Sequence, residues 1–259
     1  MQKKKEILEK KLESNEHYST EQINWLLDHI GDSDPIIRDR LVYASFCHLF
    51  LDEIISKDQA QQLFEQSQQR QLLSQDSLTR SFASLLYALI IAIDEDHPRY
   101  QNFLTNSQLQ ILFEQALDIF TFENDWRGYD ENLGWMHAGA HGADFLLTAT
   151  CHQAFPADKF EQAWQALIDC CLKQNSTFSA GEETRLAQIP VYLILNQKVS
   201  ASILVTWMEQ LDVPNQEPVE YFRWLNIQRF LSSIYFQLKS HQALAPEVEQ
   251  AIEKQIRLY

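Results

Sequence analysis

The sequence has few of the residues that interrupt regular secondary structure, with only 6 glycines and 7 prolines among 259 residues. An all-β chain rich in turns would need more of both. The 4 cysteines show no Cys-x-x-Cys spacing, and directly adjacent cysteines such as Cys170 and Cys171 rarely form a disulfide with each other. We therefore expect reduced thiols and a cytoplasmic location.

Positive charge and long apolar runs are also scarce. Lysine and arginine total 21 against 36 acidic residues, which gives a net charge of −15. A field of this sign repels nucleic-acid phosphates and anionic membrane surfaces. The longest apolar run, 85–93, is too short to cross a bilayer, and the lysine-rich start lacks the unbroken apolar core of a signal peptide. We expect no nucleic-acid partner and no membrane association.

Helical periodicity fills most of the chain. Apolar residues recur every three to four positions, with Ser, Thr or Asp before them and Gly or Pro after them, which is typical of capped amphipathic helices. The first three helices are expected near 1–13, 20–30 and 35–50. The same pattern predicts later helices near 58–72, 76–93, 107–121, 133–153, 157–173, 182–195, 199–211, 218–238 and 246–257.

Short connections between so many helices favour antiparallel pairs. A pair about every forty residues matches the repeat length of HEAT-type proteins. We expect a single all-α domain over 1–259, made of stacked antiparallel helical hairpins in a HEAT-like α/α superhelix. A closed α/α toroid is the alternative, because the same hairpins can curve until the two ends meet. The sequence shows no repeated consensus that would choose between them.

A charged cluster stands near the start of the predicted helix 35–50. Arg38, Asp39 and Arg40 follow one another there. Ion pairs between such neighbours are usually exposed to solvent and contribute little to stability. We therefore expect an ion-paired helix surface at this position.

One segment departs from the helical pattern. Four of the 6 glycines, at 128, 134, 139 and 142, lie within the stretch 123–144. Glycine inside a helix costs about 1 kcal/mol relative to alanine, so this concentration needs a compensating cause, and close approach of another element is the simplest. From 133 to 154 the only formally charged residue is Asp144. This predicts a helix over 133–153 that its neighbours cover on most sides.

The predicted helix 133–153 also carries a polar stripe. At about 100° per residue, one narrow sector holds His137, His141, Asp144 and Thr148, with His152 beside it. Polar groups removed from water must be paired. The stripe therefore indicates one of three things: a hydrogen-bonded network that only holds helices together, a pocket for a ligand, or a metal site.

The pocket hypothesis also uses residues outside the stripe. Arg127 would hold an anionic group, Trp126 and Trp135 would form walls, and a later helix near 182 would bring a carboxylate and Arg185 to the same place. The candidate ligand-binding residues are Asp125, Arg127, Tyr129, Trp135, His137, His141, Asp144, Glu183 and Arg185.

The metal hypothesis rests on spacing. His137 and His141 are four residues apart, which places both imidazoles on one helix face, and Asp144 offers an oxygen ligand one turn later. These three are the candidate ligands of a divalent metal. In a zinc protease with the H-E-x-x-H motif the residue after the first His is the glutamate base, and here it is Ala138. A hydrolase would need another base, for which Glu182 or Glu183 is the candidate.

The same segment resembles a known family. Arg-Gly-Tyr at 127–129, followed by Gly-Trp-Met-His-Ala-Gly-Ala-His-Gly-Ala-Asp at 134–144, is similar to the GW-x-H-x-x-AHGAD signature of the bacterial proteins catalogued as domain of unknown function 2785. Residues 183–186 resemble the acidic-Arg-Leu segment found later in that family. The resemblance implies an all-helical, cytoplasmic bacterial protein. It implies no activity.

Three functions remain open at this point. The leading hypothesis is a binding protein whose internal polar pocket holds a small molecule or a peptide end. The second is a metal-assisted hydrolase that uses the His137, His141 and Asp144 stripe. The third is a scaffold that binds a protein partner while the stripe is purely structural.

Overall fold

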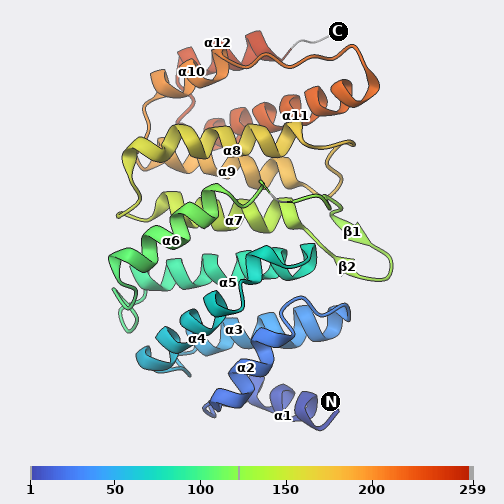
Figure 1. The fold of residues 1–259 in the computed structure, drawn as a ribbon. Coiled ribbons are helices and arrows are strands. Elements are labelled where there is room, and N and C mark those ends of the chain that lie inside the picture. The colour runs from blue at the N-terminus through green and yellow to red at the C-terminus, as the bar shows by residue number, and fades with distance from the viewer. Residues whose placement is uncertain (1, 122, 257–259) are drawn as a thin grey trace.

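A computed structural model describes residues 2–121 and 123–256 of the chain (Figure 1). The predicted all-α fold is confirmed, because helices make up most of the described residues. The elements up to the middle of the chain are α1 (Gln2–Leu12), α2 (Thr20–Asp28), the π-helix η1 (Ile36–Tyr43), α3 (Ala44–Leu51), α4 (Lys57–Gln69), the 3-10 turn η2 (Leu72–Ser74), α5 (Ser77–Asp96) and α6 (Asn106–Leu117).

The second half contains a short hairpin and further helices. Its elements are β1 (Tyr129–Asp130), β2 (Gly134–Trp135), α7 (Ala138–Cys151), the 3-10 turn η3 (Ala157–Lys159), α8 (Phe160–Leu172), α9 (Glu182–Leu195), α10 (Ala201–Glu209), α11 (Pro218–Ser240) and α12 (Pro246–Gln255). The last residue of the predicted helix 246–257 lies outside the described residues.

Local sequence signals set many helix starts. Ser19, Ser56 and Thr105 each accept a hydrogen bond from the backbone N–H three residues later, and the glutamine there bonds back to the cap. This reciprocal pairing satisfies N–H groups that the first helical turn leaves free. These caps explain why the predicted starts of α2, α4 and α6 agree with the structure to within one residue.

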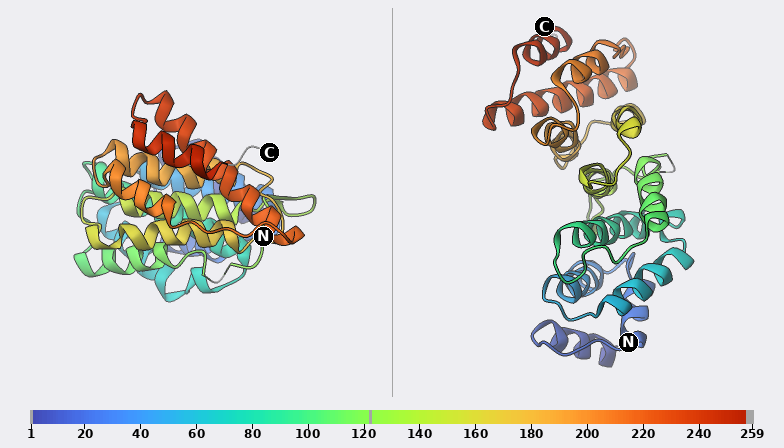
Figure 2. Two further views of the ribbon diagram at one scale, coloured as in Figure 1. Left: turned by 90° about the horizontal axis from the view of Figure 1, so that it is seen from above. Right: turned by 90° about the vertical axis from the view of Figure 1, so that its left-hand side faces the viewer.

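The helices stack in two layers. In one layer α5, α7, α9 and α11 pack side by side, and α6 and α8 cover them on one side (Figure 2). The buried apolar residues form one continuous cluster that runs from Leu8 in α1 to Ile252 in α12. The first and last helices, α1 and α12, lie at opposite ends of the stack (Figure 1), so the helices form an open arrangement and the closed toroid is wrong.

The apolar run 85–93 lies in α5, at the centre of the stack. By length and composition this helix could cross a membrane, but 72% of its most apolar window is buried against the rest of the protein. Its apolar residues therefore form core contacts.

Candidate functional site

The glycine-rich segment begins as a β-hairpin where the sequence pattern predicted a helix. Tyr129 pairs with Trp135 and Asp130 with Gly134 in antiparallel register. The Asp130 carboxylate accepts hydrogen bonds from the N–H groups of Asn132 and Leu133 at 2.9 and 3.0 Å, which closes the turn. The predicted helix 133–153 is wrong at its start, because α7 begins only at Ala138. The hairpin projects beyond the helix ends (Figure 1).

His137 joins the hairpin to α7 in a left-handed conformation, with φ 47° and ψ 31°. Histidine adopts this region more readily than most residues other than glycine, and such strain concentrates at functional sites. His137 is therefore the cap residue of α7 and is not part of its regular turns, although its carbonyl still accepts the N–H of His141 at 2.8 Å. The fold still brings the two rings together, with centroids 5.5 Å apart.

Close approach explains Gly128 and Gly142, as predicted. A Cβ at Gly128 would lie 2.6 Å from Oε1 of Glu182, and a Cβ at Gly142 would lie 2.7 Å from the Phe120 ring. At Gly139 the nearest atom would be Cγ of Glu182 at 3.4 Å, an ordinary contact. The Glu182 side chain thus lies across the first turn of α7, where a carboxylate interacts favourably with the helix dipole.

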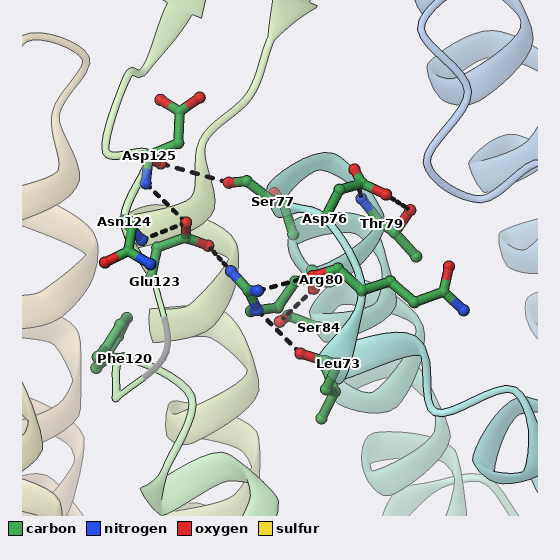
Figure 3. Close-up of polar contacts among 12 residues, drawn as sticks. Leu73, Asp76, Ser77, Thr79, Arg80, Ser84, Phe120, Glu123, Asn124 and Asp125 are labelled. Atoms are coloured by element: carbon green, nitrogen blue, oxygen red, sulfur yellow. Dashed lines mark hydrogen bonds and ion pairs between the residues drawn. The ribbon is translucent and has the colours of Figure 1, made fainter.

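A buried ion pair fixes the loop that leads into the hairpin (Figure 3). Nη1 of Arg80 in α5 donates to Glu123 at 2.7 Å, and the other Glu123 oxygen accepts the N–H groups of Asn124 and Asp125. The hydroxyl of Ser77 donates to the Asp125 carbonyl at 3.4 Å. These contacts hold the loop against the start of α5.

The guanidinium group of Arg127 forms ion pairs with two carboxylates. Its guanidinium donates to Asp125 through Nε at 2.9 Å and Nη2 at 2.6 Å, and to Asp130 through Nη1. Hydrogen bonding from Arg127 lowers the pKa of Asp125 below its ordinary value. Arg127 and its two partners therefore brace the hairpin, and the charge predicted to hold an anionic ligand is already neutralised.

Arg38 corrects the expectation of an ion-paired helix surface at 38–40. Its side chain is 0% exposed and donates to Asp39 at 2.8 Å, to the Asp32 carbonyl at 3.2 Å and to the Trp135 carbonyl at 3.0 Å. Its guanidinium also lies 4.7 Å from the centre of the Phe82 ring. Arg38 therefore ties the π-helix η1 to the hairpin, which the sequence did not indicate.

His141 is held by Ser81 of α5. The Ser81 hydroxyl lies 2.5 Å from the Met136 carbonyl and 2.8 Å from Nδ1 of His141. Burial, together with the neighbouring positive charges of His137, Arg185 and Arg38, lowers the pKa of His141 to about 3. The imidazole is therefore neutral at physiological pH. Ser81 is buried and has the carbonyl as its acceptor, so the pair lacks the geometry of a serine nucleophile and its base.

Trp135 and Tyr129 form an exposed aromatic surface over His137. Their side chains are 49% and 54% exposed, and their rings meet edge to face at 5.0 Å. The Trp135 ring also stacks on His137 at 4.6 Å with an interplanar angle of 2°. Tyr129, Trp135 and His137, predicted from the sequence, thus lie together in the structure.

Glu182 lies beneath His137. Its side chain is 2% exposed, and its Oε1 lies 3.9 Å from Nδ1 of His137, too far for a hydrogen bond. Both atoms are buried and find no hydrogen-bond partner within 2–121 and 123–256. Burial favours the protonated carboxyl, but His137 and the Ala180 N–H outweigh it, so the pKa of Glu182 lies below its ordinary value. We call Tyr129, Trp135, His137, His141 and Glu182 the hairpin site.

Asp144 and Arg185 form an ion pair at the edge of this site. Nη1 of Arg185 donates to both carboxylate oxygens, at 2.6 and 2.7 Å. Burial raises the pKa of Asp144 although Arg185 opposes the shift. Burial also raises the pKa of Tyr43, at the end of η1, and the nearby charge of Asp144 raises it further. The helix near 182 thus brings Arg185 to the polar stripe, as the pocket hypothesis expected.

Other predicted residues lie elsewhere. Glu183 lines a groove with Phe236 of α11, away from His137, so Glu182 and not Glu183 supplies the carboxylate of the hairpin site. The Thr148 hydroxyl donates to the Asp144 carbonyl within α7. His152 faces Asp94 at the far end of the helix.

The predicted metal ligands do not gather into a binding group. Within 2–121 and 123–256, no three His, Cys, Asp or Glu side chains are placed to hold a metal ion. Asp144 directs both oxygens at Arg185, and His141 turns Nδ1 toward Ser81. His137 and His141 remain one turn apart, but the His137 ring stacks on Trp135, and within the described residues no third ligand joins the two histidines.

The sequence did not identify Arg38, Ser81 or Asp39 as parts of this region. Ser81 is a small polar residue within the apolar pattern of α5, and that position was the only available signal. Arg38 and Asp39 resemble any charged helix surface until the hairpin is seen to cover them.

Comparison with protein families now bears on this geometry. Residues 73–236 match the model of a family described as a protein of unknown function, DUF2785. The chain belongs to this family. The match contains the whole hairpin site, whereas Arg38 and Asp39 lie before it. Comparisons with curated proteins and with solved structures gave no match.

Proposed function

We propose that this DUF2785 protein is a cytoplasmic, single-domain binding protein with HEAT-like stacked hairpins, and that its hairpin site takes a small polar ligand or a peptide end. The location is supported by four cysteines that are all free thiols. The architecture is supported by the two-layered open stack.

One observation carries the binding proposal: polar side-chain atoms without hydrogen-bond partners among the described residues lie beneath the exposed rings of Trp135 and Tyr129. Oε1 of Glu182 and Nδ1 of His137 have no hydrogen-bond partner. Among the described residues, Ser81 is the only hydrogen-bond partner of the His141 side chain. Buried polar atoms are paired in most proteins, so a network that served only to hold helices together would use these atoms. A ligand that lies against Trp135 would supply the missing partners.

A metal-assisted hydrolase has less support. It needs a ligand set with an open coordination position, and the described residues offer none at the hairpin site. The Ser81 hydroxyl is buried and the pKa of the Cys47 thiol is raised by burial, so neither is an activated nucleophile.

The test is a thermal-shift screen of small polar metabolites and short peptides. A ligand of the folded state raises the melting temperature, because it binds that state alone. Wild type is compared with Trp135→Ala, which removes the exposed ring, and with Phe236→Ala, an exposed ring on α11. Compounds that stabilise wild type and Phe236→Ala but not Trp135→Ala support the proposal. Stabilisation that survives in Trp135→Ala, or none from any compound, contradicts it.

A further inference from the structure

The proton of Ser81 determines what His141 offers to a ligand. A hydroxyl has one proton, and the 2.5 Å contact with the Met136 carbonyl, which only accepts, uses it. The second contact of Ser81, to His141, must then run the other way, with the Nδ1–H of His141 as donor. In a neutral imidazole the other nitrogen then carries a lone pair. Nε2 of His141 is therefore an unused hydrogen-bond acceptor.

The second unused group is also an acceptor. Oε1 of Glu182 belongs to a side chain that is 98% removed from solvent, has no hydrogen-bond partner and faces His137. Its other oxygen already accepts the Ala180 N–H at 2.9 Å. The position beside the first turn of α7, where an anion would otherwise bind, is thus taken by a carboxylate of the chain itself.

The arginines around the site are each paired. Arg38 binds Asp39, Arg127 binds Asp125 and Asp130, and Arg185 binds Asp144. Each of these guanidinium groups therefore already has at least one carboxylate partner. The chain as a whole carries −15, which attracts cations by long-range steering.

The aromatic surface completes the argument. Trp135 has one ring face against His137, and about half of its side chain is exposed next to the edge of Tyr129. Tryptophan faces bind ammonium and guanidinium groups more strongly than other aromatic side chains do.

From these contacts we propose that the hairpin site, if it binds a ligand as proposed above, takes an organic cation with N–H donors. The ligand's primary ammonium or guanidinium group would donate a hydrogen bond to Nε2 of His141 and lie against the ring of Trp135. Such a group supplies donors to acceptors that lack them, and its positive charge is attracted by the face of the tryptophan ring.

The experiment compares four probes at constant ionic strength: agmatine, n-butylamine, n-butanol and n-butyrate. Binding is followed by calorimetry and by the ¹⁵N shift of His141 Nε2. His141→Asn is the matched variant, because its amide can still donate to Ser81 while the Nε2 acceptor is removed. Trp135→Ala removes the ring, and Phe236→Ala is the control.

We expect the two amines to bind and to shift the Nε2 resonance, while butanol and butyrate do neither. His141→Asn should weaken amine binding by about tenfold or more, the loss of a charge-assisted hydrogen bond. Trp135→Ala should weaken it by about threefold, the loss of an exposed cation–π contact. Phe236→Ala should bind as wild type.

Two results would overturn the inference. If amines bind equally well to wild type, His141→Asn and Trp135→Ala, the assigned position is wrong. If no amine binds, the cationic class is wrong. The metabolite and peptide screen then separates the two proposals. A neutral or anionic compound that stabilises wild type but not Trp135→Ala would support the binding function without the cationic class. If the screen finds no such compound, both proposals are wrong.

Discussion

The two ends of α7 differ in how their free backbone groups are paired. At the C-terminal end, one lysine donates hydrogen bonds to the last backbone carbonyl groups. Nζ of Lys198 donates to the carbonyls of Thr150 at 3.1 Å, of His152 at 2.8 Å and of Cys151. At the N-terminal end no side chain caps the helix, and His137 enters it in a left-handed conformation. One end is closed by a cation placed against the helix dipole, whereas the other leaves polar groups beside an exposed hairpin.

Each end also pairs a histidine with a buried carboxylate at a distance too long for a hydrogen bond. Nε2 of His152 lies 3.7 Å from Asp94, and Nδ1 of His137 lies 3.9 Å from Glu182. Both His152 and Asp94 are fully enclosed, whereas His137 retains 21% exposure under Trp135. An unpaired atom alone therefore does not mark a site. Access to solvent and an aromatic surface distinguish the N-terminal end.

The largest effect should come from breaking the support of the N-terminal end. Arg38→Met leaves Asp39 and the Trp135 carbonyl without their buried donor, and we expect it to lower the free energy of unfolding by about 3 kcal/mol. Urea unfolding measures this change. Arg40→Met, an exposed neighbour on the same helix, should change it by less than about 0.5 kcal/mol. Equal losses in the two variants would refute the buried role of Arg38.

The next effect concerns pH. The pKa of His141 falls from 6.5 to about 3 on folding. Below about pH 6.5, His141 is therefore protonated in the unfolded chain but stays neutral in the folded chain. Stability should therefore fall as the pH drops. Between pH 7 and pH 5, wild type should lose about 2 kcal/mol more than His141→Asn. Parallel unfolding curves for the two proteins across this range would show that His141 titrates normally.

Breaking the C-terminal end should cost less. Lys198→Met removes three hydrogen bonds to carbonyls that water can partly replace, and we expect a loss of about 1.5 kcal/mol in urea unfolding. The hairpin site should keep its ligand affinity, because it lies at the other end of α7. Lys254→Met, which removes an exposed ion pair with Glu209, should leave stability unchanged and serves as the control. A loss of ligand affinity in Lys198→Met would show that the two ends are coupled.

The smallest effect separates two glycines near the N-terminal end. Gly142→Ala forces a methyl group to 2.7 Å from Phe120, and the strain outweighs the gain in helix propensity, for a net loss of about 1 kcal/mol. Gly139→Ala meets only an ordinary contact at 3.4 Å and keeps the gain in helix propensity, so it should stabilise the protein by up to about 1 kcal/mol. The difference between their melting temperatures is the measurement. The reverse order would contradict the packing described here.

Sequence periodicity predicted the helices well but not the segment that carries the site. The starts of α2, α4 and α6 follow from local caps, which a sequence displays. The hairpin depends on the fold instead, since Gly134 lies against Pro35 and the Trp135 carbonyl accepts from Arg38, about a hundred residues away. Tyr129 and Trp135 could be named as candidate ligand-binding residues because they lie close to the polar stripe in the sequence. Their arrangement around Glu182 depends on long-range packing, which the sequence does not display.

The linear stacking has a consequence for motion. Contacts run from each helix to its neighbours, so α1 and α12 have partners on one side only, while α7 lies between α5 and α9. In such arrays opening begins at the ends and spreads inward. Amide hydrogens of α1 and α12 should therefore exchange first and those of α7 last. The hairpin site is thus attached to the slowest-exchanging part of the molecule, insulated from fraying at both ends.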